Sequence, residues 1–233
     1  MKRIKPAVPE WASVVARSPS TLLQEIYGVL FQAFGPRHWW PGETPFEVMV
    51  GAVLTQNTSW TNVEKAIRRL KQEGCLDMER IHRLKNSELA SMIRSSGFFR
   101  IKAVRLKALV DFLIEGYHGE IEKMKKEPLR SLREKLLRIK GVGPETADSI
   151  LLYGLGKPVF VVDAYTKRVL SRHGVISEKA SYERVQRLFM DELPRRAALF
   201  NEYHALLVHL GKHFCRKVPR CEICPLRNVR REA

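Results

Sequence analysis

Apolar side chains recur every three or four positions through most of this chain, which is the spacing that places them on one face of an α-helix. In the stretch 21–34, for example, Leu22, Ile26 and Leu30 share a face. The apolar run 159–162 is too short and isolated to build a sheet. We therefore predict an all-α fold. The predicted helices are 21–34, 46–54, 61–72, 87–94 with Asn86 as N-cap, 101–115, 131–139, 164–172, 181–193 and 197–212.

Two glycines interrupt this pattern between the predicted helix 131–139 and a second helical stretch that begins at Pro144. Gly141 and Gly143 flank Val142, and glycine tolerates positive φ and the close approach of another backbone. Pro144 suits the first turn of a helix, where its missing N–H costs little. We expect a helix–hairpin–helix whose free backbone N–H groups bind an anion, and a DNA phosphate is the expected anion.

The charge balance points to the same kind of partner. Lysine and arginine total 41 against 25 acidic residues, a formal net charge of +16. Such an excess favours nucleic acid over an anionic membrane because no amphipathic anchor stands out, although a basic proteome or thermal adaptation would give the same excess. No apolar run is long enough to span a membrane. The basic start of the chain lacks the apolar stretch of a signal peptide, so we expect a cytoplasmic protein.

The hairpin carries a resemblance to a known family. Residues 139–148, Ile-Lys-Gly-Val-Gly-Pro-Glu-Thr-Ala-Asp, followed by Val161-Val162-Asp163, resemble the helix–hairpin–helix and Gly/Pro…Asp signature of the endonuclease III (HhH-GPD) superfamily of DNA glycosylases. The resemblance implies a monomeric enzyme of base excision repair that acts on double-stranded DNA containing a damaged base. It also implies two helical lobes, a six-helix barrel over 44–157 and a second lobe made from 1–43 and 158–233.

Asp163 is the expected catalytic residue. An aspartate before the predicted helix 164–172 is suited to be its N-cap, which would fix the position of the carboxylate. The resemblance adds the chemistry, because breaking an N-glycosidic bond builds positive charge on the sugar. A fixed carboxylate can stabilise that charge or activate water.

Glu145 occupies the position at which the strand-cleaving members of the superfamily carry a lysine. That lysine attacks the sugar and forms a Schiff base, which glutamate cannot do. Lys140, just before the hairpin, is not at this position, although it would lie near the DNA. The resemblance therefore implies a monofunctional glycosylase that uses water. The alternative role of Glu145 is a favourable negative charge in the first turn of a helix.

Gln56 ends the apolar stretch 46–54 in a polar cluster, Thr55-Gln56-Asn57-Thr58. On its own this cluster would be read equally well as a C-cap and turn. In the superfamily that the chain resembles, a glutamine at this helix end enters the DNA stack where the damaged nucleotide leaves. The adenine-mismatch branch also lacks the lysine but uses a glutamate before this glutamine, and residues 50–54 contain no acid.

Three tryptophans, Trp39, Trp40 and Trp60, lie in segments expected to border the site. Together with the hairpin and the stretch 46–58, they make the chain more similar to 3-methyladenine glycosylases of the MagIII type than to endonuclease III itself. Aromatic walls stack a flipped base and attract one that carries positive charge, as alkylated purines do. The alternative is that these tryptophans belong to the core or to a lobe interface.

Cys215, Cys221 and Cys224 crowd into ten residues, which favours metal binding over disulfides in a chain without a secretory signal. The segment resembles the [4Fe–4S] loop of the superfamily, so a [4Fe–4S] cluster is the expected cofactor. The first gap is one residue short, and the fourth cysteine is replaced by Arg230. A histidine such as His213 or an exogenous ligand could hold the remaining iron. A metal-free loop and a Cys₃His zinc site also stay open. Cys75 lies too far back in the chain to be a good fourth ligand.

The sequence thus leads to three hypotheses. The first is a monofunctional glycosylase that removes alkylated purines such as 3-methyladenine. The second is a glycosylase, with or without lyase activity, for oxidised pyrimidines or mismatched bases. The third is a non-catalytic protein that binds DNA structure.

Overall fold

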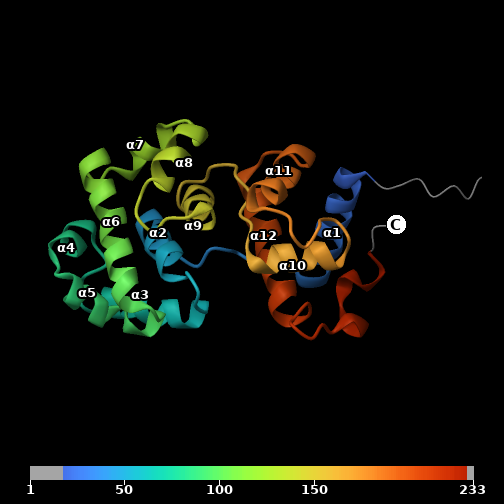
Figure 1. The fold of residues 1–233 in the computed structure, drawn as a ribbon, viewed down its shortest axis with the longest axis horizontal. Coiled ribbons are helices and arrows are strands. Elements are labelled where there is room, and N and C mark those ends of the chain that lie inside the picture. Colours follow the sequence, from blue (N-terminus) through green and yellow to red (C-terminus); the bar gives the residue numbers. More distant parts are fainter. Residues whose placement is uncertain (1–17, 230–233) are drawn as a thin grey trace, which may run out of the picture.

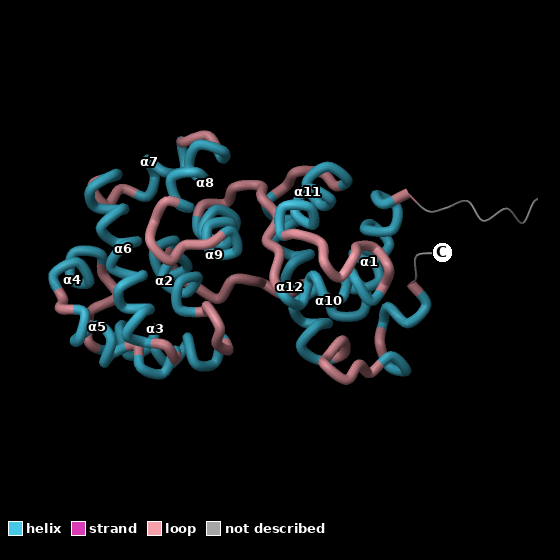
Figure 2. The backbone as a smooth tube through the Cα atoms, viewed as in Figure 1, coloured by secondary structure: helices cyan, strands magenta, loops and turns pink. Residues whose placement is uncertain are grey.

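The computed structural model describes residues 18–229. Within that span every regular element is a helix and none is a strand (Figure 2), so the predicted all-α class is confirmed. The position of Arg230, and the residues 1–17 assigned to the second lobe, lie outside the described residues. The longer helices are α1 (Pro19–Phe34), α2 (Pro45–Leu54), α3 (Trp60–Gln72), α6 (Phe99–Tyr117), α10 (Ala164–Arg172), α11 (Tyr182–Glu192) and α12 (Ala197–His213).

Shorter helices complete the chain, and their bounds follow from local sequence. The predicted bounds agree with the observed ones to within two residues. The sequence pattern missed α4 and α7, because each has six residues and buries one side chain. The short helices are α4 (Met78–Arg83), α5 (Asn86–Met92), η2 (Arg94–Ser96), α7 (Ile121–Lys126), α8 (Leu129–Leu137), α9 (Pro144–Ser149), η4 (Cys221–Ile223) and η5 (Pro225–Asn228). The π-helical η3 (Ile150–Gly154) continues α9.

One predicted cap was wrong. Asn86 is the first residue of α5 and does not cap it; Lys85 precedes the helix. The carboxylate of Glu88 accepts a hydrogen bond from the Lys85 N–H over 2.7 Å. A glutamate in the first turn thereby fixes the start of the helix without an Asn side chain.

The helices form two groups joined by two extended segments (Figure 1). Helices α2 to α9 make up one group. The other contains α10, α11, α12 and the cysteine segment, together with α1, which contacts α11 and α12 from the far end of the chain. The connecting segments cover residues 35–44 and 155–163. This is the two-lobe arrangement that we expected, and the domain boundaries at 44 and 157 stay a prediction.

Helix α2 runs through the first group and is buried at nearly every position, since α3, α6, α9 and η3 all contact it. At its start, the buried carboxylate of Glu47 binds Lys71 over 2.9 Å. At its end, the buried Lys102 donates to the carbonyl of Leu54 over 2.8 Å, which satisfies an oxygen that the helix leaves unpaired. The helix is thus held at both ends, and Gln56 follows two residues later.

Asp148 of α9 links the two groups. Its side chain is fully buried and accepts two hydrogen bonds from Arg133 of α8, at 2.7 and 3.0 Å. From α11, the Tyr182 hydroxyl and the Gln186 amide each donate to it over 2.8 Å. A buried carboxylate is tolerated only with such pairing. The network therefore fixes the hairpin helix against the second group. Along the described residues, no helix has the length and apolar character needed to cross a membrane.

Candidate active site

Asp163 stands at the N-terminus of α10, where the connection between the two groups ends. Its Oδ1 accepts a hydrogen bond from the Thr166 N–H over 2.7 Å, so the residue is an N-cap. The side chain is 13% exposed. Within the described residues Oδ2 accepts no hydrogen bond. The cap therefore fixes the carboxylate and leaves one oxygen free for chemistry.

Two residues that the sequence pattern did not single out lie beside this carboxylate. His204 of α12 is buried, and its Nε2 is 3.8 Å from Asp163 Oδ2. Its Nδ1 is 2.5 Å from the hydroxyl of Tyr153 in η3. Burial lowers the pKa of His204, against the opposing effect of Asp163. A buried histidine on an amphipathic helix resembles any core residue, which is why sequence reasoning missed it.

The three tryptophans gather into one cluster next to this histidine. The ring centroids of Trp40 and Trp60 are 5.1 Å apart, and those of Trp39 and Trp40 are 5.4 Å apart. Trp40 also packs on Tyr153, with a centroid distance of 5.0 Å. Gly51 of α2 makes room for them, because a Cβ there would lie 3.2 Å from the Trp40 indole nitrogen. All three tryptophans stay partly exposed, as the wall of a site would be.

Glu145 lies in the first turn of α9, close enough to Asp163 for the two carboxyl groups to interact electrostatically. Its side chain remains accessible to solvent, yet enough protein surrounds the carboxyl to desolvate it, a combination that a concave surface produces. This desolvation and the negative charge of Asp163 together raise the pKa of Glu145 to about 7. The position thus holds a carboxyl group that is partly protonated at neutral pH.

The hairpin uses its two glycines differently. Gly141 has a φ of +86°, and a Cβ there would collide with the side chain of Arg105 from α6. Gly143 has a φ of −92° and open space around it. Val142 is buried, and its N–H donates to the Ile139 carbonyl over 3.0 Å. The Val142 N–H is thus already used inside the hairpin, and a part for Val142 in binding phosphate stays a prediction.

The other groups of the hairpin that were predicted to bind phosphate remain available to a ligand. Within residues 18–229 the N–H groups of Gly141 and Gly143 have no hydrogen-bond acceptor, and the Lys140 side chain is exposed. They lie at the start of the continuous helix formed by α9 and η3, where N–H groups and the helix dipole favour an anion.

Gln56 sits against this hairpin. Its amide nitrogen donates to the Gly141 carbonyl over 3.0 Å and to the Thr146 hydroxyl over 2.9 Å. Arg105 donates to its Oε1 over 2.5 Å. The structure therefore brings together the turn after α2 and the hairpin. The alternative reading of the polar cluster as a C-cap and turn also holds, because Thr55 is the C-cap of α2 and the Thr58 N–H donates to the Thr55 carbonyl over 3.2 Å.

Phe98 is a further exposed residue, at the position before α6. It is 69% exposed and has a φ of +46°, uncommon for an aromatic residue. Lys102 ties its turn to the end of α2, donating to the carbonyls of Ser96 and Leu54 over 2.6 and 2.8 Å. An aromatic side chain after a glycine, outside any apolar period, was the sequence signal that could have found it.

The cysteine segment follows α12 at the far end of the second group. Cys215, Cys221 and Cys224 line one cavity of about 320 Å³, together with Arg172 and Arg220. Arg172 donates to the Cys215 sulfur over 3.4 Å. Burial raises the pKa of the Cys224 thiol, and the other two thiols add to the rise. Among the described residues, no three metal-ligating side chains converge closely enough to hold an ion in this conformation.

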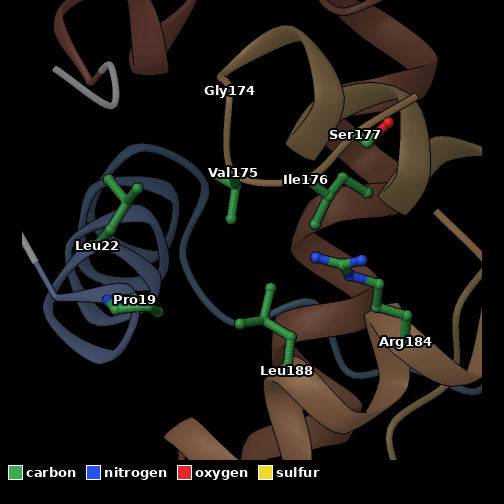
Figure 3. A pocket seen from close by; sticks show the side chains of 8 residues that line it. All are labelled: Pro19, Leu22, Gly174, Val175, Ile176, Ser177, Arg184 and Leu188. Carbon is green, nitrogen blue, oxygen red and sulfur yellow. The ribbon is translucent and has the colours of Figure 1, made fainter. Parts of the chain in front are cut away.

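The other residues considered as ligands lie elsewhere. His213 packs against His209, with a ring-centroid distance of 4.5 Å and an angle of 39° between the rings, and does not line the cysteine cavity. Cys75 follows α3 in the first helix group. A separate cavity of about 460 Å³ lies between α1, α11 and residues 174–177, with Arg184 at its wall (Figure 3). None of the candidate site residues named from the sequence lines it.

Comparison with known proteins agrees with this geometry. The sequence profile of the HhH-GPD superfamily of base excision DNA repair proteins matches residues 50–195, which include Gln56, the hairpin and Asp163. A predicted DNA repair glycosylase of Methanocaldococcus jannaschii is 49% identical over 208 residues, covering 88% of this chain and 94% of its own. Endonuclease III of Thermotoga maritima is 30% identical over 185 residues, covering 79% and 81%.

Two solved structures share the fold. The 3-methyladenine DNA glycosylase of H. pylori, bound to 1,N6-ethenoadenine, has a TM-score of 0.73 at 29% identity, covering 84% of this chain and 98% of its own. A trapped endonuclease III–DNA covalent intermediate has a TM-score of 0.79 at 26% identity, covering 90% and 94%. The chain is therefore a DNA glycosylase that belongs to the HhH-GPD superfamily of base excision DNA repair proteins.

Proposed function

We propose that this protein is a monofunctional glycosylase that hydrolyses the N-glycosidic bond of alkylated purines, such as 3-methyladenine, in double-stranded DNA. The observation that carries the proposal is the carboxyl group of Glu145 beside Asp163, where a lyase needs an amine. The similarity to the H. pylori 3-methyladenine glycosylase supports the same substrate class.

The tryptophan cluster supports the choice of base. Trp39, Trp40 and Trp60 offer electron-rich ring faces, which attract the positive charge of an alkylated purine. The carboxyl groups of Glu145 and Asp163 both act electrostatically on Tyr153, which packs on Trp40, and they reinforce this preference for a cation. An alkylated base is already a good leaving group, so the site needs no strong general acid to expel it.

The chemistry then falls to Asp163. As the base leaves, the sugar gains oxocarbenium character, and the fixed carboxylate stabilises that charge through space. Asp163 Oδ2, which accepts no hydrogen bond in the described residues, takes the proton of the attacking water as the C–O bond forms at C1′. The products are the free base and an abasic site in an uncut strand.

DNA would lie across the connection between the two groups. The N–H groups of Gly141 and Gly143, with Lys140, would bind a phosphate near the lesion. Gln56 would fill the space that the flipped nucleotide leaves, and the exposed ring of Phe98 would stack on the neighbouring bases. The side chains of Arg216, Lys217 and Arg220 in the cysteine segment are exposed and would add positive charge for contact with the DNA backbone.

Base release and strand scission are measured together to test the proposal. Duplex DNA methylated with radiolabelled dimethyl sulfate should lose free 3-methyladenine, and Asp163→Asn should slow this release by about 100-fold or more. Sodium borohydride should trap no covalent adduct on abasic DNA. Glu145→Lys, which supplies an amine at the lyase position, is the positive control for trapping. Absence of release from methylated DNA by the wild-type protein would refute the proposed substrate class.

A second candidate keeps the enzyme class and changes the substrate. The identity to endonuclease III of T. maritima and the TM-score of 0.79 to an endonuclease III–DNA complex favour a glycosylase for oxidised pyrimidines. Release of an oxidised pyrimidine, with a borohydride adduct, would select this candidate. Lys140 would then be the amine to replace first.

A [4Fe–4S] cluster is the cofactor that we propose for the cysteine segment. Three thiols face one cavity, and Arg172 and Arg220 would offset the negative charge of a thiolate-bound cluster. The fit is partial, because no fourth ligand is assigned and the thiols must move closer together. The cluster would hold the segment in shape and supply no step of base release. A visible spectrum of anaerobically purified protein should show a broad band at about 400 nm, and Cys221→Ser should abolish it.

A further inference from the structure

His204 carries a buried nitrogen without a partner. The Tyr153 hydroxyl is 2.5 Å from His204 Nδ1, and burial together with the neighbouring carboxyls keeps that hydroxyl protonated by raising the pKa of Tyr153 well above its usual value. Among the described residues Nδ1 is the only acceptor within reach of this hydroxyl, and a buried O–H needs an acceptor, so the hydroxyl donates to Nδ1. Because burial also keeps the imidazole neutral, its single proton must sit on Nε2. That N–H is buried and has no acceptor among the described residues.

An anionic oxygen lies close to this nitrogen. Asp163 Oδ2 is 3.8 Å from His204 Nε2, which exceeds an N–H···O hydrogen bond by about 1 Å. The Oδ1 of Asp163 is held by the Thr166 N–H, so a rotation of the carboxyl group about this anchor would bring Oδ2 toward His204. A buried donor and an unoccupied acceptor at this distance form a hydrogen bond after a small movement.

The pair formed by Tyr153 and His204 also spans the two helix groups. Tyr153 follows the hairpin helix in the first group, whereas His204 belongs to α12 in the second. Asp163, the N-cap of α10, belongs with α12 to the second group. The hydrogen bond between Tyr153 and His204 therefore fixes a ring beside the catalytic carboxylate from the helix that follows the hairpin.

We propose that Tyr153 and His204 position the catalytic carboxylate, with the Tyr153 hydroxyl fixing the tautomer that lets His204 Nε2–H donate to Asp163 Oδ2. The inference rests on the proposed function, in which Asp163 acts on the sugar. His204 acts through Asp163 and is a positioning residue. Its contribution therefore belongs to the rate of base release and not to the affinity for DNA.

Single-turnover release of methylated bases from dimethyl sulfate-treated duplex DNA, measured over a range of enzyme concentrations, separates these two quantities. His204→Leu should lower the saturating rate by about tenfold or more and leave the half-saturating concentration within about twofold. His204→Gln offers an amide N–H in place of the imidazole and should recover part of the rate. Tyr153→Phe keeps the ring against Trp40 and removes only the hydroxyl, so its rate should fall between these two.

Thermal unfolding identifies any variant that fails to fold, and Tyr153→Phe, the smallest change, then carries the test. An unchanged rate in His204→Leu, or equal losses in His204→Leu and His204→Gln, would overturn the positioning role. A rise in the half-saturating concentration of His204→Leu by the same factor as the fall in its rate would also overturn it. Base release that survives Asp163→Asn would instead overturn the proposed function, so the two failures are distinguishable.

Discussion

The side-chain amide of Gln56 donates to the backbone carbonyl of Gly141 over 3.0 Å. The two residues come from different turns, one after α2 and one between α8 and α9. Arg105 reinforces the joint, since it binds Gln56 Oε1 and packs against Gly141. The residue proposed to enter the DNA stack and the loop proposed to bind its phosphate are thus held together.

The two hairpin glycines should respond differently to alanine. Gly141→Ala places a Cβ on a backbone with a φ of +86° and against Arg105, so it should lower the free energy of unfolding by about 1–3 kcal/mol. Gly143→Ala has open space and a common φ, and should change stability by less than about 0.5 kcal/mol. Urea unfolding measures both.

DNA binding by the same pair tests the phosphate site. Both variants should bind DNA more weakly, Gly141→Ala because the loop shifts and Gly143→Ala because a methyl group blocks the approach of a phosphate. Full affinity in Gly143→Ala would show that no phosphate contacts this loop.

The raised pKa of Glu145 predicts a pH-dependent stability. Between about 4.5 and about 7 the carboxyl is ionised in the unfolded chain and protonated in the folded protein, so its contribution to stability falls as pH rises through this window. Glu145→Gln cannot ionise. The melting temperature of Glu145→Gln minus that of wild type should therefore increase from pH 4.5 to 7 and then stay level. A difference that is constant with pH would contradict the altered pKa.

Gly51 should determine how closely Trp40 and Trp60 pack in the proposed base pocket. In Gly51→Ala the new methyl group meets the indole of Trp40 at 3.2 Å and the ring of Trp60 at 3.4 Å, so the cluster must shift. We expect base release to slow by about tenfold, since a small misplacement of groups around the reacting centre is costly. Gly154→Ala is the matched control, because its nearest contact is an ordinary 3.5 Å. Equal activity in the two variants would remove the tryptophans from the site.

Asp148 should be worth far more to stability than a surface carboxylate. Asp148→Ala leaves Arg133 without its partner in a buried network, and should cost about 3–5 kcal/mol of unfolding free energy. Asp191→Ala removes an ion pair with Arg195 in which both side chains are about 60% exposed, and should cost less than about 1 kcal/mol. Denaturant unfolding of both variants gives the comparison. Similar losses would mean that the network does not hold the two groups together.

The sequence by itself determined the elements whose causes are local. Helices such as Ala164–Arg172 follow from apolar spacing, and the cap at Asp163 follows from the residue type before a helix. The hairpin is likewise local, because Gly141 supplies a positive φ that few other residues adopt. The prediction for Asn86 as N-cap was wrong because two adjacent residues, Lys85 and Asn86, can each stand before this helix. The hydrogen bond from the Lys85 N–H to Glu88 makes Lys85 the residue before the helix.

Only the tertiary structure decided which of these residues meet. Tyr153 and His204 are separated by 51 positions, and Gln56 and Gly141 by 85, so no local pattern pairs them. The pKa of Glu145 depends on the protein packed around it and on the charge of Asp163. Burial and distance between remote segments set these properties, and both exist only once the two helix groups have packed together.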